Sequence, residues 1–539
     1  MKNFNQFILT LLAAGLFAPC SLTEEPTSFV NRKSFYKNES QCIAALNSCY
    51  MPANAIYTAN FMLVTEACTD IWYSSSTTVD ACLDVTPAKP QYGKNVWTQG
   101  YKGVMYCNEC VECISSADLA DGVKMPLAAE ARVMRAFYYY VLTCMFGDVP
   151  FYTTMVDTDQ RLAEIRRLPR TPAHEIRQEL YDDLERNALP WFTAENGRKC
   201  RASEAVDNRS GYALALMLMA KFAMWNEDWN GALVPLQALE ELYGDFNEGN
   251  YPLAETQWRY KNPAESIFEI QHAWSLTGTQ YNGNVAAIMM PTHNGDGVFD
   301  GVPLKGYGTS MPGWSSLRAN NRYAIFRPAT GNTQTENAAY VDALFNPLPL
   351  TYDTYDATLN RYTVKIDREA LAAGEIRGQY FLGLGDLEAG ETFKITHNYG
   401  VPWPGPKFWC PDIEQNYDSN NYRIFRYADA ILMMAECYCN LENAEETMRY
   451  LNMVRQRAGV DPVTNFTGCE RARELGGEFQ RKFDLVRWGI WYDQTYAYTN
   501  NATLKGKMRP CHRYYPIPDA QCALSGYVLT NDEYLADGL

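Results

Sequence analysis

The residues of this chain that could do chemistry are mainly aromatic, and they fall in stretches that lack helical periodicity. One stretch runs from Glu66 to Pro90, and a longer one, rich in Gly, Asn and Pro, runs from Glu265 to about Gly405. Aromatic side chains on irregular surface segments can stack on ring-shaped ligands, while neighbouring carboxylates or guanidinium groups complete the hydrogen bonds. The candidate binding residues are Asp70, Trp72, Tyr73, Trp274, Tyr281, Tyr307, Trp314 and Arg322.

A structural interpretation competes with this one at each position. The chain has 37 tyrosines and 12 tryptophans, and helical repeats also use tyrosine in their cores. Trp72, for example, could equally well fold back and cap the helices.

No catalytic motif accompanies these aromatic residues. The chain lacks the H-E-x-x-H of metalloproteases, the G-x-S-x-G of hydrolases and a Walker loop. A glycoside hydrolase would need two carboxylates across a sugar, and no motif places such a pair. We therefore expect no enzyme, although a secreted glycoside hydrolase stays open as an alternative. The five histidines are scattered: His174, His272, His293, His397 and His512.

Two patterns resemble metal sites, and neither predicts one. Cys107, Cys110 and Cys113 lie in a segment with helical spacing, so their side chains would spread around a helix and not converge on one ion. Buried thiols are the favoured interpretation, with disulfides as the alternative. The segment His293–Gly301 lacks the spaced carboxylates of a calcium loop and is interpreted as turns. We expect no metal and no other cofactor.

The elements that must position the aromatic segments are helical, and the clearest is a hairpin at residues 421–459. Apolar residues recur at helical spacing from Ile424 to Tyr438, and a short polar break follows. Asn443, with Glu446 three residues later, is then a plausible N-cap of a second helix. Two helices joined in this way lie antiparallel, as in a tetratricopeptide hairpin.

The same pattern returns between Tyr212 and Leu239, with its break at Asn226–Trp229. Because one repeat cannot bury its own apolar face, two hairpins predict a mostly α-helical scaffold of stacked pairs. Further elements are a helix at Leu127–Met145, a helix opened by Thr171 as N-cap and Pro172, and strands at Ser266–Gln271 and Arg361–Ile366.

The segment Arg473–Gly489 combines a buried stripe with a predicted ladder of ion pairs three residues apart. The stripe is Leu475, Phe479, Phe483 and Val486, and the ladder is Arg481, Asp484 and Arg487.

We expect one body, residues 35–539. It divides into a helical scaffold at 35–264 and 420–490, a loop-rich ligand-binding region at 265–419, and an extended tail at 491–539 that packs over the body.

Charge and the N-terminus indicate where the protein works. A net charge of −16 argues against nucleic acid as a partner, since binding to phosphates needs a basic footprint. Residues 1–19 are interpreted as a signal peptide, with Lys2 before the apolar run Phe7–Phe17. Cys20 follows at the place where lipoproteins are cleaved and lipidated, so residues 20–34 are expected to be a lipidated tether.

Together these motifs resemble the SusD/RagB family of surface nutrient-binding lipoproteins of Bacteroidetes. The resemblance runs nearly end to end, and each motif keeps its place in the order. The motifs are LTEEPTSFVNRKSFYKNES, Trp97-x3-Tyr101-x6-Asn108, AEARVMRAFYYYVLTCMFGDVPFY, ESIFEIQ, GPKFW, NYRIFRYADAILMMAE, RELGGEFQRKFDLVRWG and YYPIP.

The resemblance implies a mostly α fold with tetratricopeptide-like hairpins and long insertions. It also implies a lipoprotein at the outer face of the outer membrane, which binds oligosaccharides or similar nutrients and passes them to a SusC-like TonB-dependent transporter. The alternatives are the secreted glycoside hydrolase and a tetratricopeptide scaffold that binds only proteins. Turnover of a glycan would favour the hydrolase, and binding without turnover would favour the nutrient-binding protein.

Overall fold

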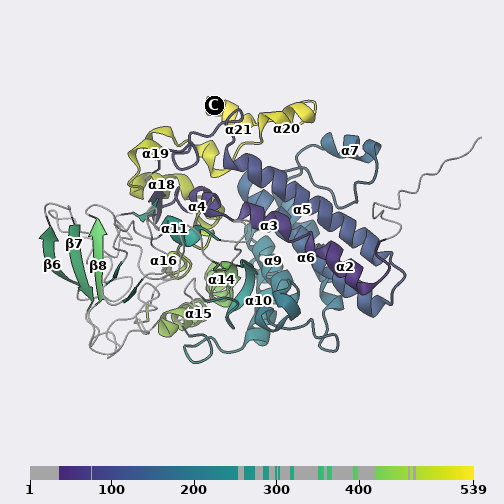
Figure 1. Ribbon diagram of the computed structural model, residues 1–539, viewed down its shortest axis with the longest axis horizontal. Coiled ribbons are helices and arrows are strands. Elements are labelled where there is room, and N and C mark those ends of the chain that lie inside the picture. The colour runs from purple at the N-terminus through teal and green to yellow at the C-terminus, as the bar shows by residue number, and fades with distance from the viewer. Residues whose placement is uncertain are drawn as a thin grey trace, which may run out of the picture.

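The computed structural model describes residues 35–74, 76–252, 260–273, 283–289, 298–299, 302–303, 316–320, 350–356, 361–366, 393–398, 419–458, 462–464 and 469–539. Helices dominate the described residues, and the strands among them are short (Figure 1). The predicted mostly α fold is confirmed. Residues 1–34, with the predicted leader and Cys20, lie outside the described residues.

The long helices are α5 (Tyr92–Ser115), α6 (Asp121–Phe146), α8 (Ala173–Asn187), α9 (Tyr212–Trp225), α10 (Trp229–Tyr243), α14 (Tyr427–Asn440) and α15 (Ala444–Arg457). The shorter helices are α2 (Glu39–Asn47), α3 (Met51–Ile56), α4 (Ala59–Thr65), α7 (Asp159–Arg166), α11 (Val285–Met289), α16 (Cys469–Glu474), α17 (Arg481–Arg487), α18 (Trp491–Tyr498), α19 (Ala502–Lys507), α20 (Asp519–Leu524) and α21 (Asp532–Ala536).

The strands are β1 (Trp72–Ser74), β2 (Ser266–Ile270), β3 (Val298–Phe299), β4 (Val302–Pro303), β5 (Leu317–Ala319), β6 (Leu350–Asp356), β7 (Arg361–Ile366), β8 (Phe393–Asn398) and β9 (Tyr422–Arg426). All described pairings are antiparallel: β1 with β5, β2 with β9, β3 with β4, and β7 between β6 and β8. The predicted strands in β2 and β7 are confirmed.

Helices α5 and α6 form the longest hairpin and run side by side (Figure 1). Every residue of α6 from Pro126 to Phe146 except Arg132 is buried. The two helices approach closely at Gly103, where an added Cβ would come within 2.4 Å of the Tyr138 ring. The helix predicted at Leu127–Met145 is therefore present and begins one and a half turns earlier.

Both predicted hairpins are present, as α9 with α10 and α14 with α15. The Asn443 side chain accepts a hydrogen bond from Glu446 N (3.2 Å), so the predicted N-cap of α15 is confirmed. The first helix of this hairpin starts later than predicted, because Tyr422–Arg426 forms β9, all five of whose residues are buried. The backbone of these residues forms hydrogen bonds with β2 and does not extend helix α14 towards its N-terminus.

The N-cap predicted at Thr171 is wrong. The backbone of Thr171 pairs with Val149, and Pro172 occupies the cap position of α8. The side chain of Asp148 accepts a hydrogen bond from Ala173 N (2.8 Å). Asp148 thus caps a backbone N–H of the first turn of α8, the role that we had predicted for Thr171.

A buried ionic network joins β2, β9, α15 and the segment after it. Arg426 contacts three carboxylates, Glu265 (2.7 Å), Glu474 (2.6 Å) and Glu478 (2.9 Å). Arg457 pairs with Glu265 and Glu474. The two guanidinium groups hold the pKa of Glu265 down at about 2, against the opposing effect of burial. Because each buried charge has a counter-charge, the network fixes how these elements meet.

In the segment Arg473–Gly489, the stripe residues Leu475, Phe479 and Phe483 are buried as predicted, whereas Val486 is only partly buried, and the segment is not one helix. Helices α16 and α17 are separated by a turn in which Gly477 (φ 79°) and Phe479 (φ 61°) adopt left-handed backbone conformations. Of the predicted ladder, only Arg487 with Asp484 (3.4 Å) forms within the segment. Asp484 also pairs with Arg471 (2.9 Å), and Arg481 pairs with Asp70 (2.7 Å). Both of these partners lie outside the segment.

The C-terminal segment 491–539, predicted to be extended, contains the four short helices α18 to α21, which lie at the top of Figure 1. The YYPIP motif is extended, because its prolines prevent helix formation. Tyr515 N donates to Met145 O (2.7 Å), and both Tyr515 and Ile517 are buried against the body.

The three cysteines of the Cys107 motif lie in α5, and Cys107 and Cys110 are buried free thiols as predicted. In the described part of the chain, no group of three or more His, Cys, Asp or Glu side chains is placed to hold a metal ion. Nor is any helix there both long and apolar enough to cross a bilayer.

Candidate functional site

The described candidate residues gather at the strand pair β1–β5. Trp72 lies opposite Ala319, Tyr73 opposite Arg318, and Ser74 opposite Leu317. This register brings a segment from the N-terminal half of the chain beside one from the loop-rich region. The prediction that both regions contribute to one site is therefore compatible with the strand pairing.

Side chains alternate between the two faces of this strand pair. Trp72, Ser74 and Leu317 are buried, whereas Tyr73 and Arg318 are both partly exposed. Residues directly opposite in antiparallel strands have Cβ atoms about 4.5–5.5 Å apart on the same face. Tyr73 and Arg318 thus form an outward-facing pair of an aromatic ring and a cation.

The backbone around β1 is fixed by contacts from distant segments. Trp491 Nε1 donates to Cys68 O (2.9 Å), and Asn501 Nδ2 donates to Ser74 O (3.1 Å). On the other side, Asn320 N donates to Ile71 O (2.7 Å) and its side-chain amide donates to Thr69 O (3.1 Å). The loop that carries Tyr73 is therefore held in place by the scaffold before any ligand arrives.

Two candidate residues are part of that support and do not face a ligand. Asp70 is 1% exposed and forms two hydrogen bonds with Arg481, at 2.8 and 2.7 Å. Trp72 is 2% exposed and packs in the core, which is the structural alternative considered for it. Asp70 is short and already paired, and Trp72 points inward from a strand, so neither side chain reaches the surface.

Beneath the loop, burial raises the pKa of Glu66 to about 8, although hydrogen bonds from the backbone and the charge of Arg481 act in the opposite direction. Glu66 is therefore largely protonated at neutral pH, and it accepts from Arg481 N (3.3 Å).

The remaining candidates lie outside the described residues: Trp274, Tyr281, Tyr307, Trp314 and Arg322. Their role stays a prediction. Arg318 was missed in the sequence because the segment SLRAN is short and has no β-branched or aromatic residue, so it is not recognised as a strand. Its position became apparent only from its partner strand.

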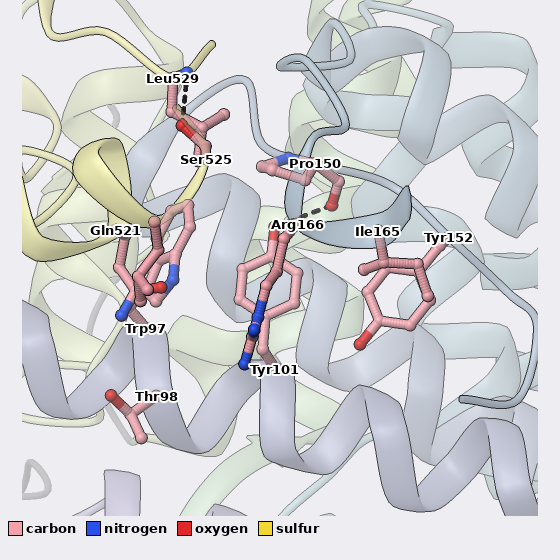
Figure 2. Close-up of a pocket in the computed structure, with 11 residues that line it drawn as sticks. Trp97, Thr98, Tyr101, Pro150, Tyr152, Ile165, Arg166, Gln521, Ser525 and Leu529 are labelled. Carbon is pink, nitrogen blue, oxygen red and sulfur yellow. Dashed lines mark hydrogen bonds between the residues drawn. The ribbon is translucent and has the colours of Figure 1, made fainter. Parts of the chain in front are cut away.

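A separate pocket of about 270 Å³ opens beside α5 (Figure 2). It lies between α5, the C-terminal end of α7, and α20 with the segment that follows it. Trp97 and Tyr101 belong to a motif that we interpreted only as a family signature, and no pattern in the sequence indicated that they line a pocket. The pocket is lined by Trp97, Thr98, Tyr101, Pro150, Tyr152, Ile165, Arg166, Gln521, Leu524, Ser525 and Leu529.

Comparison with protein families gives two matches. The model of the SusD family matches residues 411–534, and the model described as "Starch-binding associating with outer membrane" matches residues 25–189. The two matched ranges cover the C-terminal part of the scaffold and the N-terminal helices up to α8.

Curated relatives and solved structures agree with these matches. The SusD-like protein P25 of Formosa agariphila is 25% identical over 99% of both chains, and a SusD-like protein of Bacteroides ovatus is 23% identical over 75% of this chain and 67% of its own length. A SusD-like crystal structure from Bacteroides fragilis superimposes with a TM-score of 0.63 at 17% identity, covering 92% of this chain and 97% of the other.

Surface glycan-binding protein A from Bacteroides thetaiotaomicron, solved in complex with laminarihexaose, superimposes with a TM-score of 0.61 at 18% identity. The match covers 91% of this chain and 98% of that one. At this level of identity the solved structures establish a common fold.

Proposed function

Since this chain belongs to the SusD family, we propose that it is a glycan-binding protein of the cell surface and not an enzyme. It takes up an oligosaccharide or a similar nutrient and delivers it to a SusC-like TonB-dependent transporter in the outer membrane. Cys20 carries the lipid that anchors it. The laminarihexaose complex of a structural neighbour supports the ligand class.

The observation that carries the binding proposal is the outward-facing pair Tyr73 and Arg318. A tyrosine ring offers an apolar face to the C–H face of a pyranose, and an arginine beside it donates hydrogen bonds to the hydroxyl groups. Both side chains come from a strand pair held by buried contacts, so little ordering entropy is lost when a ligand binds.

The aromatic residues of the loop-rich region extend this surface in the proposal. Trp314 precedes β5 by three residues, and three residues of extended chain span at most about 11 Å. A ligand held over Tyr73 and Arg318 is therefore within reach of the segment that carries Trp314. We propose that Trp274, Tyr281, Tyr307, Trp314 and Arg322 supply further contacts along an oligosaccharide.

The experiment is a calorimetric titration of the purified soluble body against a panel of oligosaccharides that includes laminarihexaose. For a glycan that binds, Tyr73→Ala is expected to weaken affinity about tenfold or more, as loss of a stacked ring does. The matched control is Tyr212→Ala, which removes another half-buried tyrosine that has a cation, Lys199, 5.4 Å from its ring centre.

The outcomes separate the three candidate functions. Binding that Tyr73→Ala weakens about tenfold or more and Tyr212→Ala leaves intact supports the proposal. Release of shorter sugars from the glycan would make the protein a hydrolase. No binding to any member of a broad panel, together with capture of a protein partner, would favour the tetratricopeptide scaffold. The transporter is tested by its co-purification with the anchored protein from outer membranes.

A further inference from the structure

The pocket beside α5 has an aromatic wall whose geometry is fixed by the fold. The rings of Trp97 and Tyr101 lie 4.9 Å apart, and Tyr101 stacks on Tyr152 with ring centres 6.3 Å apart and planes inclined by 6°. In Figure 2, Trp97 and Gln521 lie at one end of the pocket and Tyr152 with Ile165 at the other, with Tyr101 and Arg166 between them. This arrangement presents one continuous apolar wall.

Hydrogen bonds hold this wall in one conformation. The Tyr101 hydroxyl donates to Pro150 O (2.8 Å), and the Tyr139 hydroxyl binds both the backbone N–H (2.9 Å) and the carbonyl oxygen (2.8 Å) of Tyr152. Opposite them, Ser525 Oγ accepts from Leu529 N (3.1 Å). A ligand ring would therefore meet surfaces that need no rearrangement.

The rim of the pocket is cationic in an otherwise acidic protein. Arg166 is the last residue of α7 and is exposed, and the negative end of the helix dipole favours a cation there. Arg167 and Arg170 follow in the sequence, whereas the net charge of the whole chain is −16. Arg170 Nε donates a hydrogen bond to the backbone oxygen of Asp148 (2.8 Å). In the part of the chain that the structure describes, neither Arg166 nor Arg167 forms an ion pair.

The size of the pocket suits a small ligand. Its volume of about 270 Å³ gives room for one sugar ring. A planar guanidinium donates two parallel hydrogen bonds to the oxygens of an anionic group. It therefore binds an anionic group more strongly than it binds a hydroxyl group.

We propose that this pocket is a second saccharide site, which binds a single pyranose ring bearing an anionic substituent. The ring lies against Tyr101 and Trp97, and the carboxylate or sulfate ester pairs with Arg166. The site differs in place and chemistry from the neutral glycan surface at Tyr73, so it goes beyond the function proposed above.

The test compares D-glucuronic acid, D-glucose 6-sulfate and D-glucose by saturation-transfer NMR and calorimetry at low ionic strength. Binding of at least one anionic sugar about tenfold or more tighter than glucose is expected, because a charge-assisted hydrogen bond is worth about that factor. The carboxylate and sulfate probes show which anion the site prefers. Arg166→Gln should remove the preference over glucose.

Two variants serve as controls. Arg167→Gln makes the same charge change on a neighbouring exposed arginine that does not line the pocket, and it should retain the preference. Thr98→Trp fills the pocket from an exposed position on α5, so it should abolish binding without lowering the melting temperature.

The proposal is overturned by glucose binding as tightly as the anionic sugars, by equal losses in Arg166→Gln and Arg167→Gln, or by no detectable binding of any probe. Its failure is separable from that of the proposed function, because Tyr73→Ala should leave the anionic sugar bound while Arg166→Gln should leave oligosaccharide binding unchanged.

Discussion

Asp70 and Arg481 are 411 positions apart in sequence and form a bidentate ion pair, with Nε–Oδ1 and Nη2–Oδ2 distances of 2.8 and 2.7 Å. Asp70 is 2% and Arg481 7% exposed at the side chain. The pair ties the loop that carries Tyr73 to the start of α17, and through α17 to the helical scaffold.

We expect Asp70→Asn to lower the free energy of unfolding by about 3 kcal/mol, because it removes the negative charge that is paired with the buried Arg481 guanidinium. Urea denaturation measures the change. Glu533→Gln is the control, since it breaks the half-exposed pair with Arg513 (3.0 Å) and should cost under about 1 kcal/mol. Equal losses in both variants would mean that the Asp70 pair contributes no more than a surface contact.

The close approach of α5 and α6 gives a second prediction. In Gly103→Ala the added methyl group would meet Tyr138, whose hydroxyl is held by Ala53 N (3.0 Å), so we expect a loss of about 1–3 kcal/mol. Gly122→Ala, where nothing lies within 4 Å, should instead stabilise the protein by up to about 1 kcal/mol. Thermal unfolding of both variants checks the sign, and a stabilising Gly103→Ala would contradict the packing.

A third prediction concerns pH. His512 is buried, and burial lowers its pKa from 6.5 to about 4, with the charges of Lys482 and Arg509 acting in the same direction. Nδ1 accepts from Arg509 N (3.0 Å), and Nε2 lies 3.2 Å from Val85 O, an arrangement that suits the neutral ring. Because the folded pKa lies below the ordinary value, this histidine contributes full stability above pH 6.5.

As pH falls from 6.5 to 4 that contribution is lost, up to about 3 kcal/mol at 1.36 kcal/mol per unit. His512→Gln should reduce the slope of the unfolding free energy against pH in this interval, to which buried His272 also contributes, whereas exposed His174→Gln should leave the slope unchanged. Urea titrations at several pH values provide the measurement. Parallel curves for wild type and His512→Gln would refute the assignment.

A fourth prediction tests the anchor. Cys20→Ala should move the protein from the membrane fraction to the soluble fraction, because its thiol is the proposed lipid attachment site. Cell fractionation with detection by antibody is sufficient, and Cys200→Ala, which changes a partly buried free thiol of the body, is the control. Retention of Cys20→Ala in the membrane would exclude a lipid at this residue.

The sequence by itself determined the helical hairpins, because their signals are local. The period of apolar residues and the cap at Asn443 act within a few positions, and this cap is present, 3.2 Å from the Glu446 amide. The chemical character of the loops, aromatic and without catalytic motifs, was also apparent without coordinates.

Only the tertiary structure decided which of those residues face solvent. Asp70, Trp72 and Tyr73 are consecutive or nearly so, and one is paired internally, one is packed in the core and one faces outward beside Arg318. The same holds for Tyr422–Arg426, whose apolar spacing fits a helix but whose backbone pairs with β2. Burial, strand pairing and ion pairing depend on partners hundreds of residues away, and no local pattern contains that information.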